Sequence, residues 1–586
     1  MKIAIIKWII ANKTALLLSL IILFAALFRF YALNWDGEFY FHPDERNIAD
    51  AVNRLDYTGC FEMLFVTSES NLAHQCDLNP NFFAYGPLPM YIVRLFANED
   101  FDRTLILLRI QSAILSTAII PLFYFICKNL FKENKRLPKW SLICSLFVAI
   151  SPGLIQFAHF GTFEIFLTFQ YSLLLLFLIK YIKTENIKWV YLSCLVIGLS
   201  ISTKIISLAM LPVVFIILIL VKTSSPKLNF KEILKWIRDI PYNIIGRGLL
   251  IIFATVLLTS PYIILDYDSF IGSINYESAV ANGSAVVFYT QQFIGTQPVL
   301  YQFIKVFPYI FGMGLTLAFI PSFIFLTVKS IGFLYSFIKH KGHKRSRLIY
   351  FAVLLILCAY GIFHLSMYVK WTRYMIPLLP FMILNVMIFF RYIFHKTWGH
   401  RILRLITLLI FIILLTVSLY ETSTFMRRYK TEDVRILFAK WTESNIETES
   451  KVVFETADMG VIPFEQVQES YSRTPVDMYN IEDMNSLETG RINRAIQNAD
   501  YIILFSNRVY PLRFKERELF PEGYKFYSGL NNGDLGFTQV IAFNNTLGQI
   551  DSKIDLEYAS GDFFPDETYN VFDNPTIIVY KRSEPL

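Results

Sequence analysis

Two adjacent carboxylates follow the first long apolar run of the chain, in a stretch that reads His42-Pro43-Asp44-Glu45-Arg46. A carboxylate can take a proton from a hydroxyl group, and a cation beside it can hold it in place. The same stretch could simply begin a helix, because Pro43 suits a first helical position and acids in a first turn gain about 0.3–1 kcal/mol from the helix dipole. Neighbouring helical residues point about 100° apart, so one acid could face a cavity while the other pairs with Arg46. Spacing alone leaves both interpretations open.

Three further stretches place polar side chains beside long apolar runs. Glu164 and His159 lie in SPGLIQFAHFGTFE, Lys204 lies in GLSISTKII, and Lys370 and Arg373 lie in VKWTRYMIPLLP. A charge costs about 2.5–3.5 kcal/mol at the centre of a membrane helix, so charges that persist near helix ends are functional candidates. Each also has a structural interpretation, as a helix-start acid, an interface histidine, a snorkelling lysine or a helix anchor. Together, such cations could bind a phosphate while a carboxylate activates a hydroxyl.

These residues must be positioned by membrane helices, because 54% of the 586 residues are hydrophobic and only 17% are charged. About 20 apolar residues cross a bilayer, and runs of this kind recur from residue 14 to residue 420. The sequence therefore predicts about eleven transmembrane helices. Their expected positions are 14–33, 104–127, 140–157, 163–182, 188–203, 204–221, 248–266, 300–328, 348–368, 374–391 and 402–420.

Lysine and arginine alternate along the loops between these helices as the positive-inside rule requires. The N-terminus, with Lys2, Lys7 and Lys13, and every second loop after it are basic. We therefore expect a multi-pass plasma-membrane protein with a cytoplasmic N-terminus, an uncleaved first helix and the candidate residues on the outer side. This topology accounts for the net charge of +7, so no nucleic-acid partner is expected.

The outer loop at residues 34–103 is long enough to hold juxtamembrane helices. Apolar residues recur at helical spacing from Ile48 to Leu55, and a second amphipathic segment runs from Pro89 to Ala97. Cys60 and Cys76 lie in the same loop. Because an oxidising exterior permits disulfides, we expect these two cysteines to be bonded to each other.

The composition changes after Tyr420 to that of a soluble domain. Asp433 to Trp441 is predicted to be helical, and KVVFET, DYIILFS, TQVIAF and TIIVYK are predicted strands. The chain thus divides into a transmembrane domain at 1–420 and an extracytoplasmic α/β domain at 421–586. The C-terminal domain carries no glycine-rich phosphate loop and no nucleophile elbow.

An ordered set of motifs resembles the GT-C superfamily of polytopic glycosyltransferases. The motifs are HPDE, YGPLPMYI, LRIQSAILSTAIIPLFYFICKNLF, SPGLIQFAHFGTFE, GLSISTK and RYMIPLLP. The nearest relatives that they suggest are protein O-mannosyltransferases and bacterial aminoarabinose-transferase-like enzymes, over residues 10 to about 420. The resemblance implies a polytopic α-helical membrane protein of the GT-C type that uses a polyprenyl-phosphate sugar.

The resemblance also implies roles for individual residues. Asp44 would be the catalytic base, Glu45 its supporting neighbour, and Glu164 the family's second acidic position, which is usually an aspartate. Lys204 and Arg373, with Tyr374 beside them, would hold the lipid phosphate. Five further residues would shape the site, namely His42, Arg46, Arg109, His159 and Lys370.

The implied reaction is a single displacement. Asp44 would take the proton of an acceptor hydroxyl, whose oxygen attacks the anomeric carbon, and the polyprenyl phosphate would leave with inversion. General-base assistance contributes about 10²–10⁴-fold to such a step. The expected partners are the lipid-linked sugar, membrane lipids and an acceptor on a protein, a lipid or a glycan, and no cofactor is required.

Three alternatives stay open at this point. A transporter or flippase would place its charges near the midplane and show repeated halves, which the sequence does not. A non-catalytic assembly subunit of the same fold is the second alternative. The third is a metal-dependent transfer, in which Asp44, Glu45 and Glu164 converge on a divalent cation.

Overall fold

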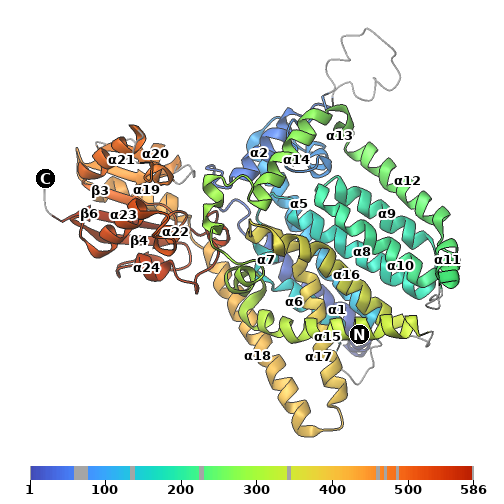
Figure 1. Cartoon of the computed structure of the whole chain (residues 1–586). Coiled ribbons are helices and arrows are strands. Elements are labelled where there is room, and N and C mark those ends of the chain that lie inside the picture. The colour runs from blue at the N-terminus through green and yellow to red at the C-terminus, as the bar shows by residue number, and fades with distance from the viewer. Residues whose placement is uncertain are drawn as a thin grey trace.

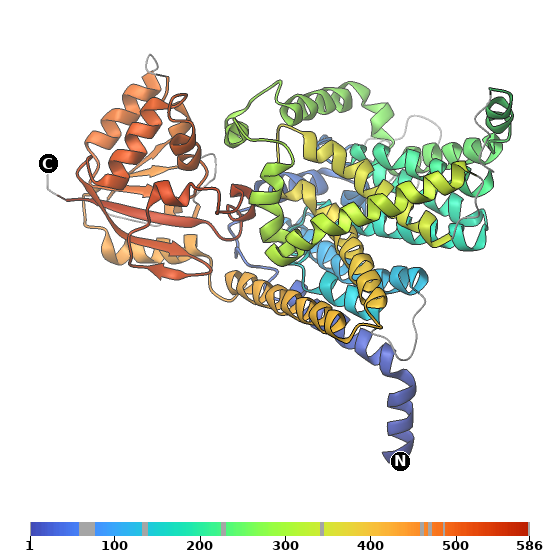
Figure 2. The same cartoon turned by 60° about the horizontal axis from the view of Figure 1, so that its bottom comes forward.

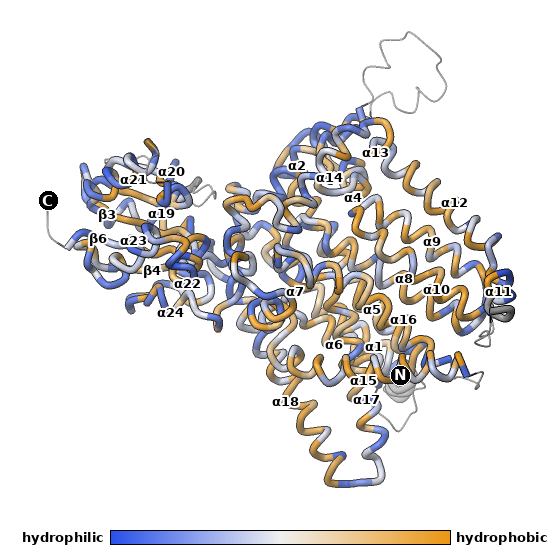
Figure 3. Tube along the Cα trace, in the orientation of Figure 1, coloured by the Kyte–Doolittle hydropathy of each residue, from blue (hydrophilic) through white to orange (hydrophobic). Residues whose placement is uncertain are grey.

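The computed structural model describes residues 2–57, 77–131, 139–223, 230–339, 345–456, 462–466, 471–483 and 487–583. A bundle of apolar helices forms most of the molecule, and a small α/β domain lies at one end of it, beyond helix α18 (Figure 1). Hydrophobic residues dominate the bundle, whereas hydrophilic residues gather on the α/β domain and around α2 (Figure 3). Cys60 and Cys76 lie outside the described residues, so their disulfide stays a prediction.

Nine helical segments of the described chain are long and apolar enough to cross a membrane. They are built from α1 (Lys2–Phe30), α5 (Phe101–Leu130), α8 (Glu164–Thr184), η2 (Ile205–Met210) with α10 (Leu211–Lys222), α12 (Tyr242–Thr259), α15 (Met313–Ile338), α16 (Arg345–Ser366), α17 (Leu379–Lys396) and α18 (Arg401–Phe425). Two shorter apolar helices, α6 (Trp140–Ala149) and α9 (Lys188–Ile201), match the remaining two predicted spans. The prediction of a polytopic α-helical membrane protein is therefore confirmed.

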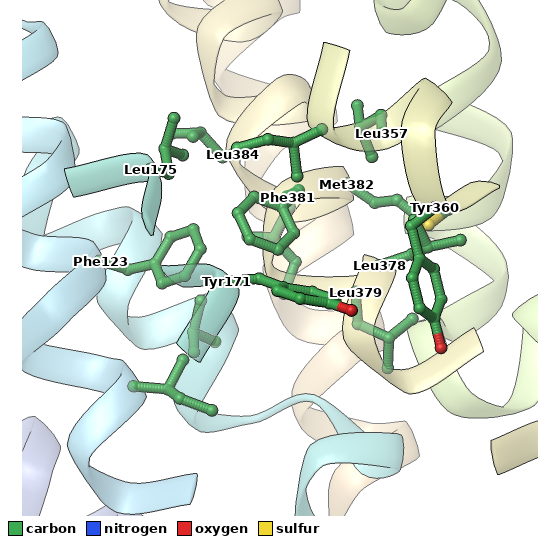
Figure 4. Close-up of a cluster of buried hydrophobic side chains, with 14 of the residues drawn as sticks. Phe123, Tyr171, Leu175, Leu357, Tyr360, Leu378, Leu379, Phe381, Met382 and Leu384 are labelled. Atoms are coloured by element: carbon green, nitrogen blue, oxygen red, sulfur yellow. The ribbon is translucent and has the colours of Figure 1, made fainter. Parts of the chain in front are cut away.

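The core of the bundle is packed with aromatic and aliphatic side chains from helices far apart in the sequence. Helix α5 contacts α1, α2, α6 and α8. Phe123 of α5 and Phe381 of α17 point toward one another with ring centroids 5.8 Å apart, and Tyr171 of α8 lies beside them (Figure 4). Close packing of this kind holds membrane helices together, because lipid tails are as apolar as the helix surfaces.

Short elements at one end of the bundle carry the polar residues that the sequence singled out. Helix α2 (Pro43–Arg54) begins with Pro43 in its first turn and buries Ile48, Ala51 and Val52, as the periodicity predicted. The other short helices are α4 (Leu88–Arg94), α7 (Pro152–Gln156), α11 (Phe230–Arg238), α13 (Tyr262–Leu265), α14 (Tyr267–Asn282), η3 (Phe288–Phe293), η4 (Gln302–Val306), η5 (Pro308–Gly312), η6 (Thr372–Leu378) and η7 (Met426–Tyr429).

The C-terminal domain is built on a six-stranded mixed sheet of order β2-β1-β3-β6-β4-β5. Strands β1, β2 and β3 are parallel, whereas β6 and β4 run antiparallel to their neighbours. The strands are β1 (Lys451–Glu455), β2 (Ser472–Val476), β3 (Tyr501–Leu504), β4 (Phe537–Asn544), β5 (Gly548–Ile550) and β6 (Thr576–Arg582). The four predicted strands correspond to β1, β3, β4 and β6.

The central strands of this sheet are buried on both sides, because helices cover both of its faces. Phe438 and Phe464 pack on one face, and Ile492, Phe526 and Leu556 pack on the other. The elements are α19 (Val434–Asn445), α20 (Ile462–Gln466), η8 (Met478–Asn480), α21 (Leu487–Gln497), α22 (Tyr510–Lys515), α23 (Pro521–Asn532), α24 (Leu556–Ala559) and η9 (Glu567–Tyr569).

One segment of the C-terminal domain returns to the membrane helices, and we call residues 561–574 the docking segment. Asp573 accepts hydrogen bonds from Arg428 at 2.8 Å, from the Tyr429 hydroxyl at 2.6 Å and from Gln156 at 3.2 Å. Asp566 accepts one from the Tyr301 hydroxyl at 2.6 Å. Figure 2 shows the resulting proximity of the C-terminal domain to one end of the bundle.

Candidate active site

A cavity of about 1000 Å³ opens where α2, η2, α14, η6 and the docking segment meet. Asp44, Lys204, Arg373 and Tyr374, all predicted site residues, line this one space although they are far apart in the sequence. His42 lines it as well. The fold therefore brings a carboxylate and two cations into a shared cavity.

Asp44 and Arg373 form an ion pair inside the cavity, with side chains only about a quarter exposed. The Tyr85 hydroxyl lies 3.4 Å from Oδ2 of Asp44 and accepts a hydrogen bond of 3.1 Å from Arg373. Burial by itself would raise the pKa of Asp44, but the charges of Arg373, His42 and Lys204 and the Tyr85 hydroxyl hold that pKa below its usual value. Asp44 is therefore ionised at neutral pH and can accept a proton.

Lys204 lies between an acid and two aromatic rings. Its Nζ is 3.4 Å from Oε1 of Glu164 and 5.0 Å from the ring centres of both Tyr85 and Tyr374. Burial lowers the pKa of Lys204, and the Glu164 carboxylate opposes this effect. The second carboxylate oxygen of Glu164 is buried without a hydrogen-bond partner. An anion in the cavity would add a second charge partner for this lysine.

A close contact between two loops sets the position of Tyr85 over Lys204. The backbone N–H of Gly86 donates to the Thr203 carbonyl at 2.9 Å, and that of Leu88 donates to the Ser202 carbonyl at 3.2 Å. A Cβ atom on Gly86 would collide with the backbone of Ser202, so only glycine permits this approach. The turn at Gly86 and Pro87 thus fixes the part of the cavity wall where Tyr85 lies against Lys204.

Two parts of the cavity wall differ in character. Ile205, Ile206, Leu208 and Ala209 of η2 form an apolar part, and Leu208 is half exposed on the bundle surface. The C-terminal domain contributes Arg508, Thr568 and Phe572 to the wall. The Phe572 ring stacks on His42 with centroids 4.1 Å apart. The cavity therefore offers both apolar side chains and polar groups to a ligand.

Comparison with known proteins finds a family that matches part of the chain. Residues 84–258 match the family of dolichyl-phosphate-mannose-protein mannosyltransferases. The match confirms the resemblance that the motifs suggested, over a segment that includes Glu164 and Lys204 but neither Asp44 nor Arg373. We call residues 84–258 the family segment. No curated protein matches the chain.

Several solved structures share parts of the fold at low identity. An oligosaccharyltransferase from Archaeoglobus fulgidus tethered with an acceptor peptide is 12% identical with a TM-score of 0.47, covering 95% of this chain and 78% of its own. The apo form of that enzyme is 13% identical with a TM-score of 0.46, covering 94% and 77%. ArnT from Cupriavidus metallidurans bound to undecaprenyl phosphate is 12% identical with a TM-score of 0.46, covering 84% and 93%.

Glu45 takes a different place from its neighbour Asp44. Arg109, in the family segment, pairs with Glu45 at 2.6 Å and with Asp36 at 2.7 Å, and all three side chains are fully buried. Glu45 also accepts a hydrogen bond from the backbone of Gly161. Neither Glu45 nor Arg109 lines the cavity. Glu45 therefore anchors α2, which carries Asp44, and its role as the supporting neighbour of the base stays a prediction.

The other predicted residues lie around the cavity but do not line it. His159 is fully buried, and its Nδ1 and Nε2 lie 2.9 and 2.8 Å from the carbonyl oxygens of Ile155 and Tyr31, which accept a hydrogen bond from whichever ring nitrogen is protonated. Lys370 donates to the Tyr368 carbonyl at 2.6 Å and is also buried. Arg46 and Glu164 likewise do not belong to the cavity wall. His159 and Lys370 thus have structural partners, and Glu164 pairs with Lys204, which does line the cavity.

The sequence assigns no role to several groups that complete the cavity. Tyr85 lies in the YGPLPMYI motif, which by itself gives it no function. Tyr289 of η3 and Trp371, the residue before η6, also line the cavity. Phe572 comes from the C-terminal domain, more than 500 residues from its partner His42. No sequence pattern signals such a distant contact.

Within the described residues, no group of three or more His, Cys, Asp and Glu side chains is placed to hold a metal ion. Asp44, Glu45 and Glu164 point to separate partners, namely Arg373, Arg109 and Lys204. The residues present therefore do not fit the alternative in which three acids share a divalent cation. The expectation that no cofactor is required stays a prediction, and a chelator tests it against the metal-dependent alternative.

Proposed function

We propose that this protein is a membrane glycosyltransferase that moves a sugar from a polyprenyl-phosphate donor to an acceptor hydroxyl. The observation that carries the proposal is the meeting of Asp44, Lys204 and Arg373 in one cavity that also has an apolar wall. The two cations suit a phosphate, and the wall at η2 suits the lipid chain that bears it. The family match of residues 84–258 supports a lipid-phosphate sugar as the donor.

In this mechanism the donor phosphate binds Lys204 and Arg373. Asp44 takes the proton from the acceptor hydroxyl, and the oxygen forms a bond to the anomeric carbon. The bond between that carbon and the phosphate oxygen breaks, and the electron pair leaves with the phosphate. Fixed cations stabilise the charge that develops on the leaving phosphate. Inversion at the anomeric carbon follows from a single displacement.

The test uses the purified protein with a panel of polyprenyl-phosphate sugars and candidate acceptors, with and without chelator. We expect Asp44→Asn to lower transfer by about 10²–10⁴-fold while binding of the lipid phosphate is retained. Asp50→Asn, on the same helix but exposed and outside the cavity, is the matched control and should keep wild-type activity. Unchanged transfer by Asp44→Asn would reject Asp44 as the base. Inactivity on every lipid-linked sugar would favour a transporter or a non-catalytic subunit.

A further inference from the structure

Helix α14 presents one face to the cavity. Its residues Ile274, Glu277, Ser278, Ala281 and Asn282 line the cavity and recur at i, i+3, i+4, i+7 and i+8, so they lie on the same side of the helix. In the sequence, this helix lies between the membrane helices α12 and α15, and its residues form part of the cavity wall. Glu277 is the charged residue on this face.

The carboxylate of Glu277 is half-buried and makes no hydrogen bond or ion pair with another described residue. Burial raises the pKa of Glu277, the charges of Arg373 and Lys204 oppose this effect, and Asp44 adds to it. The carboxylate is thus close enough to interact electrostatically with Arg373, Lys204 and Asp44. Among the described residues of the cavity wall, Asp44 and Glu277 are the acids, and Asp44 already has Arg373 as its partner.

An acid in this position is unsuited to a phosphate, because like charges repel. A half-buried carboxylate without a protein partner suits a ligand that supplies hydrogen-bond donors instead. Once the lipid phosphate occupies Lys204 and Arg373, the group attached to it must lie in the remaining part of the same cavity. That group is the sugar, whose ring carries hydroxyl donors or an ammonium donor.

We propose that Glu277 binds the sugar of the donor by accepting hydrogen bonds from its ring substituents, and so selects which sugar is transferred. This inference rests on the proposed function, since it requires a lipid-phosphate sugar in the cavity. It assigns specificity to α14, which lies outside the family segment, and leaves the lipid phosphate to Lys204 and Arg373. Glu277 is a substrate-contacting residue in this assignment, distinct from the base.

The test compares binding of bare polyprenyl phosphate with binding of polyprenyl phosphates that carry a neutral hexose or an amino sugar. For each sugar-bearing lipid, the measured quantity is the ratio of its dissociation constant to that of bare polyprenyl phosphate, which isolates the contribution of the sugar. We expect wild-type protein to prefer one sugar-bearing lipid, and Glu277→Ala to lower that preference roughly ten- to a hundredfold without changing the affinity for the bare lipid. Asp268→Asn, an exposed acid on the same helix and outside the cavity, should change neither constant.

Glu277→Gln separates the two kinds of sugar donor. An amide still accepts a hydrogen bond from a hydroxyl, so this variant should keep most of the preference for a neutral sugar. It removes the charge that an ammonium group requires, so it should lose the preference for an amino sugar. An unchanged ratio in Glu277→Ala would overturn the inference and leave the proposed function intact. Failure of wild-type protein to bind any of the lipids would overturn the proposed function and this inference with it.

Discussion

The Asp44 carboxylate lies against the cation that is proposed to bind the donor phosphate. While Arg373 pairs with Asp44, it lowers the proton affinity of that carboxylate. A bound phosphate would compete for the same guanidinium, and the proton affinity of Asp44 would rise. We therefore expect the base to become stronger when the donor binds, which favours an order in which the lipid-linked sugar precedes the acceptor. If Asp44 were not paired with Arg373, donor binding would not change its proton affinity in this way.

Replacement of Tyr85 by phenylalanine tests the environment of the base. Tyr85 helps to hold the pKa of Asp44 down, together with Arg373, His42 and Lys204. Loss of the hydroxyl should raise that pKa, and since the base must be ionised, the acid limb of the pH profile of kcat/KM should move to higher pH. Tyr289→Phe removes a hydroxyl from the same cavity that contacts Tyr276 instead, and should leave the limb in place. A limb that does not move in Tyr85→Phe would exclude Asp44 as the group that titrates.

Helix α2 depends on a buried ion triad to hold Asp44 at the cavity. Arg109 of α5 forms ion pairs with both Asp36 and Glu45. Replacement of Arg109 by alanine would therefore leave two buried carboxylates without a cation. Breaking a buried pair in this way costs about 3–5 kcal/mol, and the variant should unfold at a clearly lower temperature in detergent. Arg103→Ala, an exposed position on the same helix, is the control and should melt like wild type. Equal melting of the two variants would show that the triad does not stabilise α2.

The docking segment should affect phosphate binding through η6. Asp566 accepts hydrogen bonds from the Tyr301 hydroxyl at 2.6 Å, the Thr372 hydroxyl at 3.3 Å and the Thr568 backbone at 3.0 Å. Since Thr372 precedes Arg373, Asp566→Ala should loosen that arginine and weaken lipid-phosphate binding. With about 1 kcal/mol for each lost bond, we expect roughly a tenfold loss or more. Titration of the protein with polyprenyl phosphate measures this loss of affinity. Asp562 is largely exposed in the same segment, so the control variant Asp562→Ala should bind the lipid phosphate normally.

Elements with a strong local pattern could be predicted from the sequence, and those fixed by tertiary contacts could not. The apolar spans, the Pro43 helix start and strands β1, β3, β4 and β6 follow from periodicity and composition. Strand β2 contains Pro475 and polar residues, and β5 has three residues, so neither carries a strand pattern. The motifs named Asp44, Lys204 and Arg373, and the fold brings these three residues to one cavity. They could not place Glu45 in the triad or Phe572 on His42, because those contacts depend on packing between distant segments.

The described residues form four hydrophobic cores, one in the helix bundle, a smaller one around α2 and α4, and two on the faces of the C-terminal sheet. The docking segment and η7 join them through Asp573, Arg428 and Tyr429. Each part buries its own apolar surface, so the stability of the sheet can change without that of the bundle. A titratable group buried in one core should therefore act on that core alone.

Glu455 of β1 is such a group. One of its oxygens accepts a hydrogen bond from the Tyr527 hydroxyl at 3.0 Å, and the other is buried without a partner. Burial raises the pKa of Glu455 to about 8, although Tyr527 and Arg513 oppose the shift and Asp477 adds to it. The folded domain thus binds this proton more tightly than the unfolded chain, whose glutamate has a pKa of about 4.3. This contribution to stability is complete below the unfolded value and is lost as the pH rises through about 8.

The stability of the C-terminal sheet should therefore fall between about pH 5 and pH 8, by at most roughly 1.4 kcal/mol per pH unit. Hydrogen exchange of the strand amides in the full-length protein measures this slope, and the amides of α5 and α8 serve as an internal reference that should not follow it. Glu455→Gln keeps a neutral side chain of the same size at every pH, so its profile should be flat. Glu447→Gln alters an exposed acid of the same domain that pairs with Lys581, and should keep the wild-type slope. A slope that survives in Glu455→Gln would mean that another group of the sheet binds the proton.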